Sequence, residues 1–390
     1  MTKVLSVVID NHIGGIQNRL LGLGNGLNEL GVQYLFLAPY GEGDFTNIAK
    51  KSGFKVYQAS IHTPKQFNSL NNIFNNFLWI IKFPLGIMET IKIIYREDID
   101  IVHVNGLLAL HAALAAKITR TPLVWHLIST IYPSYLVKIL RPFYRRCSDR
   151  IVFVAYNTIE YYLNNNKYNN IKVIYEPVDL NFFNRDLISK FIQDEEKHKL
   201  DLNENINIIG FVGNINPQKG LENFVDVAYK LLNINKKLKF VIVGNASKEN
   251  SKYLTKIKDK IHFLEMDDDI IFTGKVTDLR KILSIMDIFL MTSISEGTPV
   301  VILEAMAMEI PVIAPNVGGI SEQILDGKTG FVIPPSNNDA TLMALQVLLS
   351  NTELRDEMGK AGRERAGALF SLQKCIKSHY DLYSHLVKRE

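Results

Sequence analysis

Short hydrophobic runs rich in β-branched residues alternate along this chain with longer segments in which apolar positions recur at helical spacing. This alternation is typical of parallel sheets covered by helices, and it occurs twice. In the first half the predicted strands are 4–9, 33–37, 55–57, 99–104, 123–127, 150–154 and 172–175. In the second half they are 206–212, 238–243, 270–273, 288–291, 312–314 and 330–333.

The segment 181–205 separates the two halves. It has little strand character and contains the charged run 194–199, so it is predicted as a solvated helix and linker. The predicted domains are therefore 1–180 and 206–370, followed by a C-terminal helix at 371–390 that is expected to pack back on the first domain. A chain of 390 residues suits two domains, each with its own core. The predicted fold class is α/β.

Composition excludes several classes of protein. The 44 basic and 40 acidic side chains leave a net charge of +4, which does not support nucleic acid as a partner. Cys147 and Cys375 are far apart, so neither a disulfide framework nor a zinc cluster is expected, and a reducing cytoplasm fits best. The first residues read as a strand rather than a signal peptide. The apolar stretch 77–88 is broken by Lys82 and Pro84 and is shorter than the roughly 20 residues of a spanning helix.

Glycines mark the loop after the first strand. Gly14 and Gly15 precede a helical segment, where free amides and the helix dipole favour an anion such as phosphate. A simple tight turn explains them equally well. Gly22, Gly24 and Gly26 imitate a dinucleotide fingerprint but fall inside the helix, so Gly22 and Gly26 are predicted to permit close helix packing instead.

The most informative stretch follows the strand 288–291. Thr298 is predicted to cap a helix that begins at Pro299. The amides of Gly297 and Thr298 suit an anion, whereas Glu296 and Glu304 would repel it unless they bind hydroxyl groups. This combination favours a ligand that carries both phosphate and sugar. The alternative places Glu296 in a solvent-facing loop and Glu304 on a helix surface.

A second loop, 213–220, follows the strand 206–212 and ends in Lys219-Gly220. A lysine at the start of a helix is electrostatically unfavourable, so Lys219 is better explained by an anion held between its ammonium group and the amides. A solvated lysine remains the alternative.

Together these features resemble glycosyltransferase family 4. The resemblance rests on Gly14-Gly15, on the loop 217–220, on the Glu296-x7-Glu304 spacing within 296–311, and on the segments 317–322 and 326–330. It implies a GT-B architecture, with two Rossmann-like domains whose parallel sheets face an interdomain cleft. It also implies a nucleotide-sugar donor, UDP- or GDP-linked, transfer with retention of configuration, and neither a metal nor a cofactor.

The resemblance also implies roles for individual residues. Lys219 would neutralise the donor diphosphate, Glu304 would bind the ribose, and Glu296 would meet the sugar. His126, placed after a strand ending at Trp125, would lie beside the transferred sugar as a catalytic residue with Glu296 and Lys219, whereas His103 is expected in the core. The donor-binding set is Gly14, Gly15, Gly213, Asn214, Lys219, Gly274, Glu296, Gly297, Thr298, Pro299, Val300 and Glu304.

One position departs from the family. Asn214 stands where the family usually has an arginine, and Arg280 and Lys275 are the candidates to replace that cation. Two acidic clusters, 98–100 and 267–269, imitate metal-binding D-x-D pairs but are predicted to be solvated strand starts.

Residues 133–146 combine aromatic and aliphatic side chains with four cations, Lys138, Arg141, Arg145 and Arg146. With 77–88, they predict peripheral contact with the cytoplasmic face of the inner membrane. The alternative is an amphipathic helix packed on the sheet with its basic face in water.

The resulting prediction is a cytoplasmic, metal-independent hexosyltransferase that acts on a glycan or lipid-linked glycan. Bacterial surface polysaccharide, such as lipopolysaccharide or capsule, is the expected product. The alternatives are a catalytically silent sugar-nucleotide or glycan-binding module, suggested by Asn214, and a GT-B epimerase or phosphorylase.

Overall fold

The computed structural model describes residues 1–12, 14–41, 43–61, 70–130, 132–164, 168–204 and 206–387. The side chains of residues 70–80 lie outside this description, so the first part of the predicted membrane segment 77–88 is not described. The chain divides into two compact units, Met1–Glu176 with Leu372–Glu390, and Pro177–Ser371. Each unit contains one parallel sheet, which confirms the predicted α/β class.

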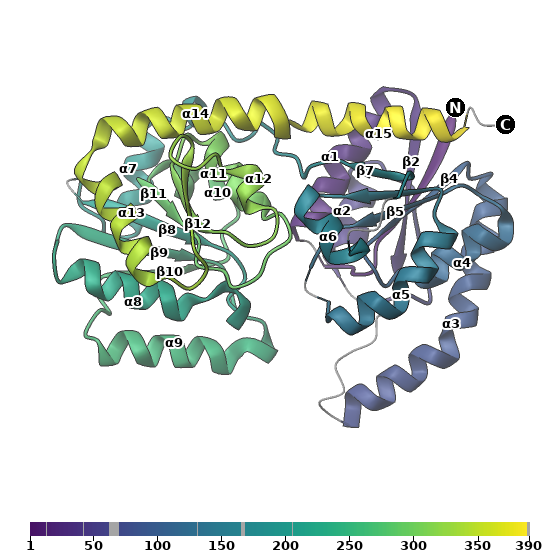
Figure 1. The fold of residues 1–390 in the computed structure, drawn as a ribbon, viewed down its shortest axis with the longest axis horizontal. Helices are drawn as coiled ribbons and strands as arrows, with labels where there is room; N and C mark the ends of the chain where they lie inside the picture. Colours follow the sequence, from purple (N-terminus) through teal and green to yellow (C-terminus); the bar gives the residue numbers. More distant parts are fainter. Residues whose placement is uncertain are drawn as a thin grey trace. The chain divides into compact units, whose positions relative to one another are not determined.

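The first unit has a seven-stranded sheet of order β3-β2-β1-β4-β5-β6-β7, parallel throughout (Figure 1). Its strands are β1 (Thr2–Val7), β2 (Val32–Pro39), β3 (Val56–Ala59), β4 (Ile101–Asn105), β5 (Leu123–Leu127), β6 (Arg150–Phe153) and β7 (Ile171–Val173). Its helices are α1 (Gly15–Glu29), α2 (Asp44–Lys51), α3 (Leu70–Glu97), α4 (Leu110–Thr119), α5 (Ser134–Cys147), α6 (Tyr156–Leu163) and α15 (Leu372–Val387).

Alternation along β1 divides the core of this unit between two layers of helices. Leu5 and Val7 pack into a cluster with α3, α4, α5 and α6, and Val4 and Val8 pack into a second cluster with α1, α2 and α15. All four side chains are essentially inaccessible to solvent. Because each fully buried aliphatic side chain contributes about 1.5–3 kcal/mol, both layers stabilise the sheet.

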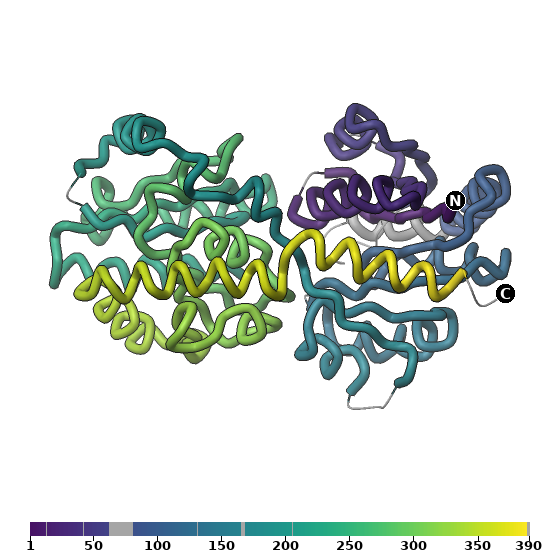
Figure 2. Tube along the Cα trace, turned by 90° about the horizontal axis from the view of Figure 1, so that it is seen from above, coloured from purple at the N-terminus to yellow at the C-terminus, as the bar shows by residue number. Residues whose placement is uncertain are grey.

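Close packing between α1 and α15 explains two of the helix glycines. A Cβ atom on Gly22 would lie 3.4 Å from Leu372, and one on Gly26 would lie 2.1 Å from the Cδ1 atom of Ile376. The predicted close-packing role of Gly22 and Gly26 is therefore confirmed. The C-terminal segment, yellow in Figure 2, lies along α1 in this unit.

The second unit has a six-stranded parallel sheet of order β10-β9-β8-β11-β12-β13. Its strands are β8 (Asn207–Val212), β9 (Leu238–Val243), β10 (Ile270–Gly274), β11 (Ile288–Leu290), β12 (Val312–Pro315) and β13 (Gly330–Ile333). Its helices include α7 (Lys190–Lys199), α8 (Leu221–Leu232), α9 (Ser251–Phe263), α10 (Leu279–Ser284), α11 (Val300–Ala307), α12 (Ile320–Gln323), α13 (Asn338–Ser350) and α14 (Thr352–Phe370). The segment expected as a linker, 181–205, contains α7 and lies within this unit.

Both sheets reverse their strand order beside their first strand. In the first unit β1 pairs with β2 and β4, and in the second unit β8 pairs with β9 and β11. Ligands of open parallel sheets bind at the carboxyl ends of the strands on either side of such a reversal. This places the loops after β1, β8 and β11 where a site is expected.

Candidate functional site

Two loops of the second unit bring opposite charges together. Lys219 lies in the loop after β8, Glu296 lies in the loop after β11, and the Lys219 Nζ and Glu296 Oε1 atoms are 2.6 Å apart. Their side chains are only 19 % and 11 % exposed. The structure therefore joins these two predicted residues at one edge of the sheet, and the alternative of a freely solvated Lys219 is wrong.

Backbone hydrogen bonds fix these two loops to each other. The Ile294 amide donates to the Gln218 carbonyl at 2.8 Å, and the Thr292 hydroxyl donates to the Lys219 carbonyl at 3.1 Å. Gly220 has a φ of +62°, and a Cβ atom there would lie 2.2 Å from the Thr292 carbonyl oxygen. Only glycine fits this turn, so the position of Lys219 is set by the backbone.

The loop after β12 closes against the same turn. The Gly319 amide donates to the Gly297 carbonyl at 2.6 Å. Gly318 has a φ of +58°, and a Cβ atom there would lie 2.2 Å from the carbonyl oxygen of Glu296. The segment 317–322, noted for its resemblance to the family, thus supports the backbone of Glu296 and Gly297.

Gly213 and Gly274 lie at the same carboxyl edge. Gly213 follows β8, Gly274 ends β10, and Gly244 between them donates its amide to the Gly274 carbonyl at 2.9 Å. The next residue after Gly213, Asn214, is exposed. These predicted donor-binding positions are therefore neighbours on one unit.

Three side-chain oxygens in these loops have no hydrogen-bond partner in the described structure although the atoms are buried. They are Asn216 Oδ1, Ser293 Oγ and Thr298 Oγ1. A buried polar group without a partner is costly in a native protein, so each of these atoms is a place where a ligand or water can complete the bonding.

The predicted cap by Thr298 is wrong. Pro299 occupies the N-cap position, α11 begins at Val300, and no side chain caps the helix. A proline at this position leaves the neighbouring Thr298 hydroxyl unused. The first amides of α11 therefore have no side-chain cap and remain able to bind a ligand.

Glu304 lies in the second turn of α11, and it is not a fully solvated surface residue. Burial raises the pKa of its carboxyl group to about 7. Desolvation is the cause, because a charged carboxylate is disfavoured where few polar groups surround it. A carboxyl group in this state can exchange hydrogen bonds with a ligand hydroxyl group.

Arg280, a candidate for the cation missing at Asn214, is paired within the second unit. Its guanidinium group forms a bidentate pair with Asp278, with a shortest distance of 2.7 Å, and lies 3.9 Å from the ring centre of Phe182. Lys275 directly follows Gly274 and is exposed, so it stays the candidate at this edge.

One aspartate in each of the acidic clusters 98–100 and 267–269 has a partner within its own unit. An Asp100 carboxylate oxygen accepts the Lys3 amide at 2.7 Å, and Asp269 pairs with Lys239 at 2.9 Å. These contacts agree with their prediction as strand-start residues.

In the first unit, the glycine loop leads directly into α1. Gly14 is the N-cap residue, no side chain caps the helix, and both Gly14 and Gly15 are exposed. The Gln17 side-chain Nε2 atom donates to the Asp10 carbonyl at 3.3 Å, which braces the loop. The backbone amides at the start of α1 therefore have no side-chain cap.

His126 lies within the strand predicted at 123–127 rather than in the loop after it. Strand β5 continues to Leu127, so His126 is within the strand, and its side chain is completely buried. Its Nδ1 atom lies 3.3 Å from Nε2 of His103 and 3.5 Å from Nη1 of Arg19. The His126 Nε2 atom is buried and has no hydrogen-bond partner among the described residues. Burial lowers the pKa values of both histidines.

Arg19 and Glu176 form a buried ion pair that the sequence pattern did not predict. Arg19 Nη1 lies 3.1 Å from Glu176 Oε1, and Nη2 donates to Asn105 at 3.0 Å. Burial raises the pKa of Glu176, and the guanidinium group of Arg19 partly offsets this. The sequence does contain one indication of this pair, because Arg19 is a charged residue on the otherwise apolar face of α1.

Three buried histidines beside this pair, His103, His126 and His379, place ring nitrogens within 4.8 Å of one another. His379 donates from Nδ1 to the Cys375 carbonyl at 2.9 Å. The guanidinium group of Arg19 lies against the cluster and disfavours a further cation there.

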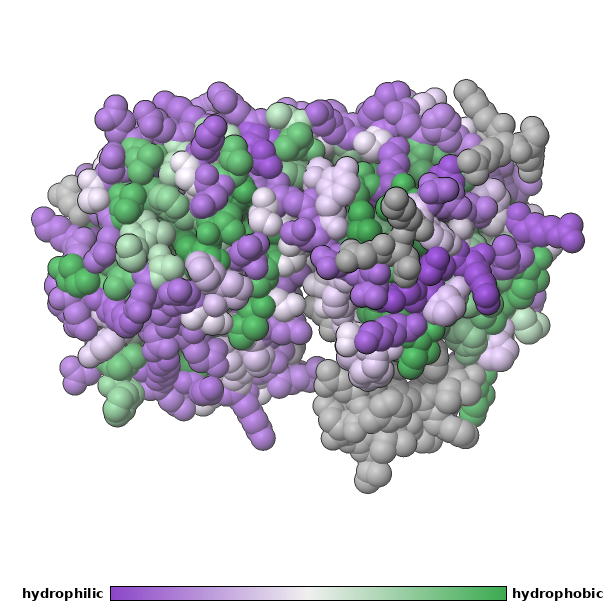
Figure 3. Space-filling model, in the orientation of Figure 1, coloured by the Kyte–Doolittle hydropathy of each residue, from purple (hydrophilic) through white to green (hydrophobic). Residues whose placement is uncertain are grey.

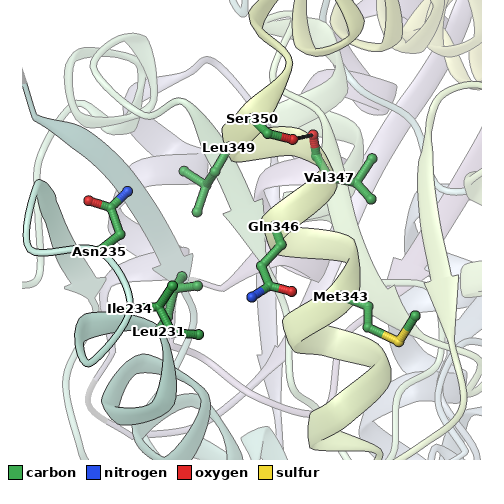
Figure 4. Close-up of a pocket in the computed structure, with 8 residues that line it drawn as sticks. All are labelled: Leu231, Ile234, Asn235, Met343, Gln346, Val347, Leu349 and Ser350. Carbon is green, nitrogen blue, oxygen red and sulfur yellow. Dashed lines mark hydrogen bonds between the residues drawn. The ribbon is translucent and has the colours of Figure 1, made fainter.

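A hollow of about 520 Å³ between α8 and α13 is separate from these loops (Figure 4). It is lined by Leu231, Ile234, Asn235, Met343, Gln346, Val347, Leu349 and Ser350. None of these side chains titrates or carries charge, so the hollow offers no groups for bond-breaking chemistry.

The two parallel sheets, each with a glycine loop at its reversal point, define an α/β protein of the GT-B class. The family model for glycosyl transferases group 1 matches residues 192–365, and that for Glycosyltransferase Family 4 matches residues 13–182. The chain belongs to glycosyltransferase family 4.

Relatives and solved structures are consistent with this assignment. The chain is 29 % identical over 199 residues, half of each chain, to the capsular polysaccharide biosynthesis glycosyltransferase CapM of Staphylococcus aureus. It is 26 % identical over 385 residues, 95 % of this chain and 96 % of the relative, to an Escherichia coli UDP-Gal:alpha-D-GlcNAc-diphosphoundecaprenol alpha-1,3-galactosyltransferase. The structure of Anabaena Alr3699/HepE in complex with UDP-glucose has a TM-score of 0.85 and 18 % identity, covering 99 % of this chain and all of the other.

Proposed function

We propose that the second unit binds a nucleotide-sugar donor and that the enzyme transfers the sugar to a glycan or lipid-linked glycan with retention of configuration. The observation that carries this proposal is the buried Lys219 and Glu296 pair, held by glycine turns at the carboxyl edge of the sheet. The unpartnered oxygens of Asn216, Ser293 and Thr298 lie in the same loops.

Lys219 serves the donor diphosphate in this proposal. Cleavage of a glycosyl phosphate bond develops negative charge on the leaving diphosphate, and a fixed ammonium group stabilises that charge more in the transition state than in the ground state. Lys219 exchanges its 2.6 Å contact with Glu296 for one with phosphate, which frees Glu296 to accept hydrogen bonds from the sugar hydroxyl groups. The proposal assigns neutralisation to Lys219 and to backbone amides rather than to a divalent cation.

Glu304 contacts the ribose in this proposal. Gly14 and Gly15 are proposed to offer backbone amides to an anion at the start of α1. His126 is not assigned a direct contact with the sugar, because its ring is completely buried. It acts instead as a positioning residue that supports the carboxyl end of β5 through His103 and Arg19.

A uridine diphosphate sugar is the first donor to test. One similar solved structure is a complex with UDP-glucose, and one relative is named for UDP-Gal. Two relatives are named for capsule or lipopolysaccharide synthesis, which supports a bacterial surface polysaccharide as the product.

The acceptor proposal includes a peripheral contact with the cytoplasmic membrane face. Within the described residues, no helix is both long enough and apolar enough to span a bilayer. Helix α5 carries the basic and aromatic residues of 133–146, and its Tyr135 and Ile139 side chains are exposed. A lipid-linked acceptor would be reached from this surface.

The experiment is a thermal-unfolding screen of the full chain with UDP- and GDP-sugars, followed by a transfer assay with the stabilising donor. A donor at 100 times its Kd stabilises the protein by about 2.7 kcal/mol. NMR of the product then reports the anomeric configuration. Stabilisation without turnover would favour a silent binding module, and an altered sugar nucleotide without acceptor would favour an epimerase.

A further inference from the structure

The positive charge of this chain is concentrated in one stretch. Residues 101–148 contain no aspartate or glutamate and six basic side chains, Lys117, Arg120, Lys138, Arg141, Arg145 and Arg146. The first unit has 22 basic and 13 acidic side chains, a net charge of +9, whereas the second has 22 basic and 27 acidic, a net charge of −5. The modest overall charge of +4 therefore conceals a strongly basic first unit.

Four of these cations line one hollow on α5. The hollow has a volume of about 300 Å³ and is formed by Lys138, Arg141, Pro142, Arg145, Arg146 and Tyr168. It has no carboxylate in its lining, and among the described residues none of the four cations forms an ion pair. Four unneutralised cations around one hollow are the arrangement that binds a phosphate group. We call this hollow the α5 pocket.

Two of the guanidinium groups are held in place before any ligand arrives. Arg141 Nε donates to the Tyr162 carbonyl at 2.7 Å, which anchors its guanidinium group. Arg145 lies 4.8 Å from the ring centre of Tyr168, whose hydroxyl donates to the Arg145 carbonyl. Because these side chains lose little freedom on binding, an anion gains affinity from them.

Exposed apolar side chains occur on α5 itself and elsewhere in the first unit. On α5, Tyr135 and Ile139 are 66 % and 68 % exposed, and they lie on the outward face with Lys138. On α3, in the same helical layer, Ile81 and Met88 are more than half exposed. Hydrophobic and strongly hydrophilic surface lies side by side over α5 (Figure 3). Aromatic and aliphatic groups among cations fit the interface of an anionic bilayer, whereas a soluble anion uses only the cations.

We propose that the α5 pocket binds the phosphate headgroup of an anionic membrane lipid while Tyr135 and Ile139 enter the bilayer interface. This deepens the membrane contact of the proposed function by naming the group that is bound. It is a second anion site, built by the first unit, and it shares no residue with the donor loops of the second unit.

The test is flotation of the full chain with phosphatidylcholine vesicles, with and without phosphatidylglycerol. We expect binding only to the vesicles with phosphatidylglycerol. Each basic residue at an anionic surface changes the partition coefficient about 5-fold, so Lys138→Gln with Arg146→Gln should weaken binding about 25-fold. Tyr135→Ser with Ile139→Ser should also weaken it. The matched control is Lys252→Gln with Lys256→Gln, in a hollow on α9 that also contains Asp259 and should leave binding unchanged.

Several outcomes would overturn the inference. Vesicle binding that survives Lys138→Gln with Arg146→Gln in a correctly folded protein would remove the α5 pocket as the site. Inorganic phosphate that displaces the protein from vesicles at equal phosphate concentration would assign the pocket to free phosphate. Binding of a single-stranded RNA oligonucleotide that is stronger than vesicle binding, and is lost in the same variant, would assign it to nucleic acid.

The failure of this inference is separable from that of the proposed function. UDP binding is measured on the same preparations, and the variant on α5 should bind UDP as wild type does. A wild-type chain that binds vesicles but no nucleotide sugar would contradict the proposed function and leave the α5 pocket in place. A chain that binds UDP-glucose but no anionic vesicle would contradict the α5 pocket and leave the proposed function in place.

Discussion

Replacement of Glu304 by glutamine should change the pH dependence of stability and the affinity for a nucleotide sugar in opposite directions. Glu304 is the carboxyl group in the second turn of α11 whose pKa burial raises from 4.5 to about 7. A carboxyl group with a raised pKa in the folded state holds its proton more tightly there than in the unfolded chain. The free energy of unfolding therefore falls as pH rises from about 4.5 to about 7 and then stays constant.

The magnitude follows from the size of the shift. A difference of about 2.5 pKa units corresponds to about 3 kcal/mol, of which about 2.5 kcal/mol is lost between pH 5 and pH 8. Glutamine resembles the protonated carboxyl group and cannot ionise. Glu304→Gln should therefore match wild type near pH 5 and be the more stable protein by about 2.5 kcal/mol at pH 8. The same variant should bind a nucleotide sugar more weakly, because the ribose loses a charged partner.

The assay is urea unfolding of wild type and Glu304→Gln at pH 5, 7 and 8, with Glu357→Gln as the control. Glu357 is an exposed carboxylate on α14, so its replacement controls for the loss of one surface charge. A Glu304→Gln variant whose advantage does not grow with pH would refute the reasoning. Equal growth in the control would refute it as well.

Three further substitutions test how the structure is held together. Gly318→Ala places a Cβ atom 2.2 Å from the Glu296 carbonyl oxygen in a left-handed turn. We expect the free energy of unfolding, measured with urea, to fall by about 2–3 kcal/mol, and UDP binding, measured by calorimetry, to weaken. Unchanged UDP binding would contradict a role for this turn in holding Glu296. Glu176→Gln leaves the buried charge of Arg19 without its counter-ion and should cost about 3 kcal/mol, measured by urea unfolding, whereas a neutral result would mean that the pair is solvated. Gly26→Ala forces Ile376 on α15 to shift, so it should lower the unfolding temperature although alanine is the better helix former. A higher unfolding temperature would show that α15 can move away without loss of packing.

Hydrophobic periodicity predicted the architecture well because both sheets are buried on two faces. The strands of the second unit are continuous apolar runs, and the predicted 330–333 coincides with β13 (Gly330–Ile333). The close packing of α1 was also predictable, because the helical period alone places Gly22 and Gly26 on one face. Such signals are local, so a single sequence contains them.

The parts that the sequence did not predict depend on contacts between distant segments. The burial of His126 results from Arg19 on α1 and from His379 on α15, more than 100 and 250 residues away in the chain respectively. The pairing of Lys219 with Glu296 likewise joins residues 77 positions apart. The Thr298 cap failed for another reason, because Pro299 itself occupies the N-cap position and α11 starts one residue later than the local pattern suggests.

The most direct test of the account is calorimetric titration of the full chain with UDP-glucose in the presence of EDTA, for wild type, Lys219→Ala and Lys236→Ala. Lys219 forms the buried pair with Glu296, whereas Lys236 is an exposed lysine after α8. The account predicts binding without divalent cations, a Kd raised at least about 10-fold by Lys219→Ala through loss of a charge-assisted contact, and no change with Lys236→Ala. Binding that requires a divalent cation, or that is equally tight in Lys219→Ala, would contradict it.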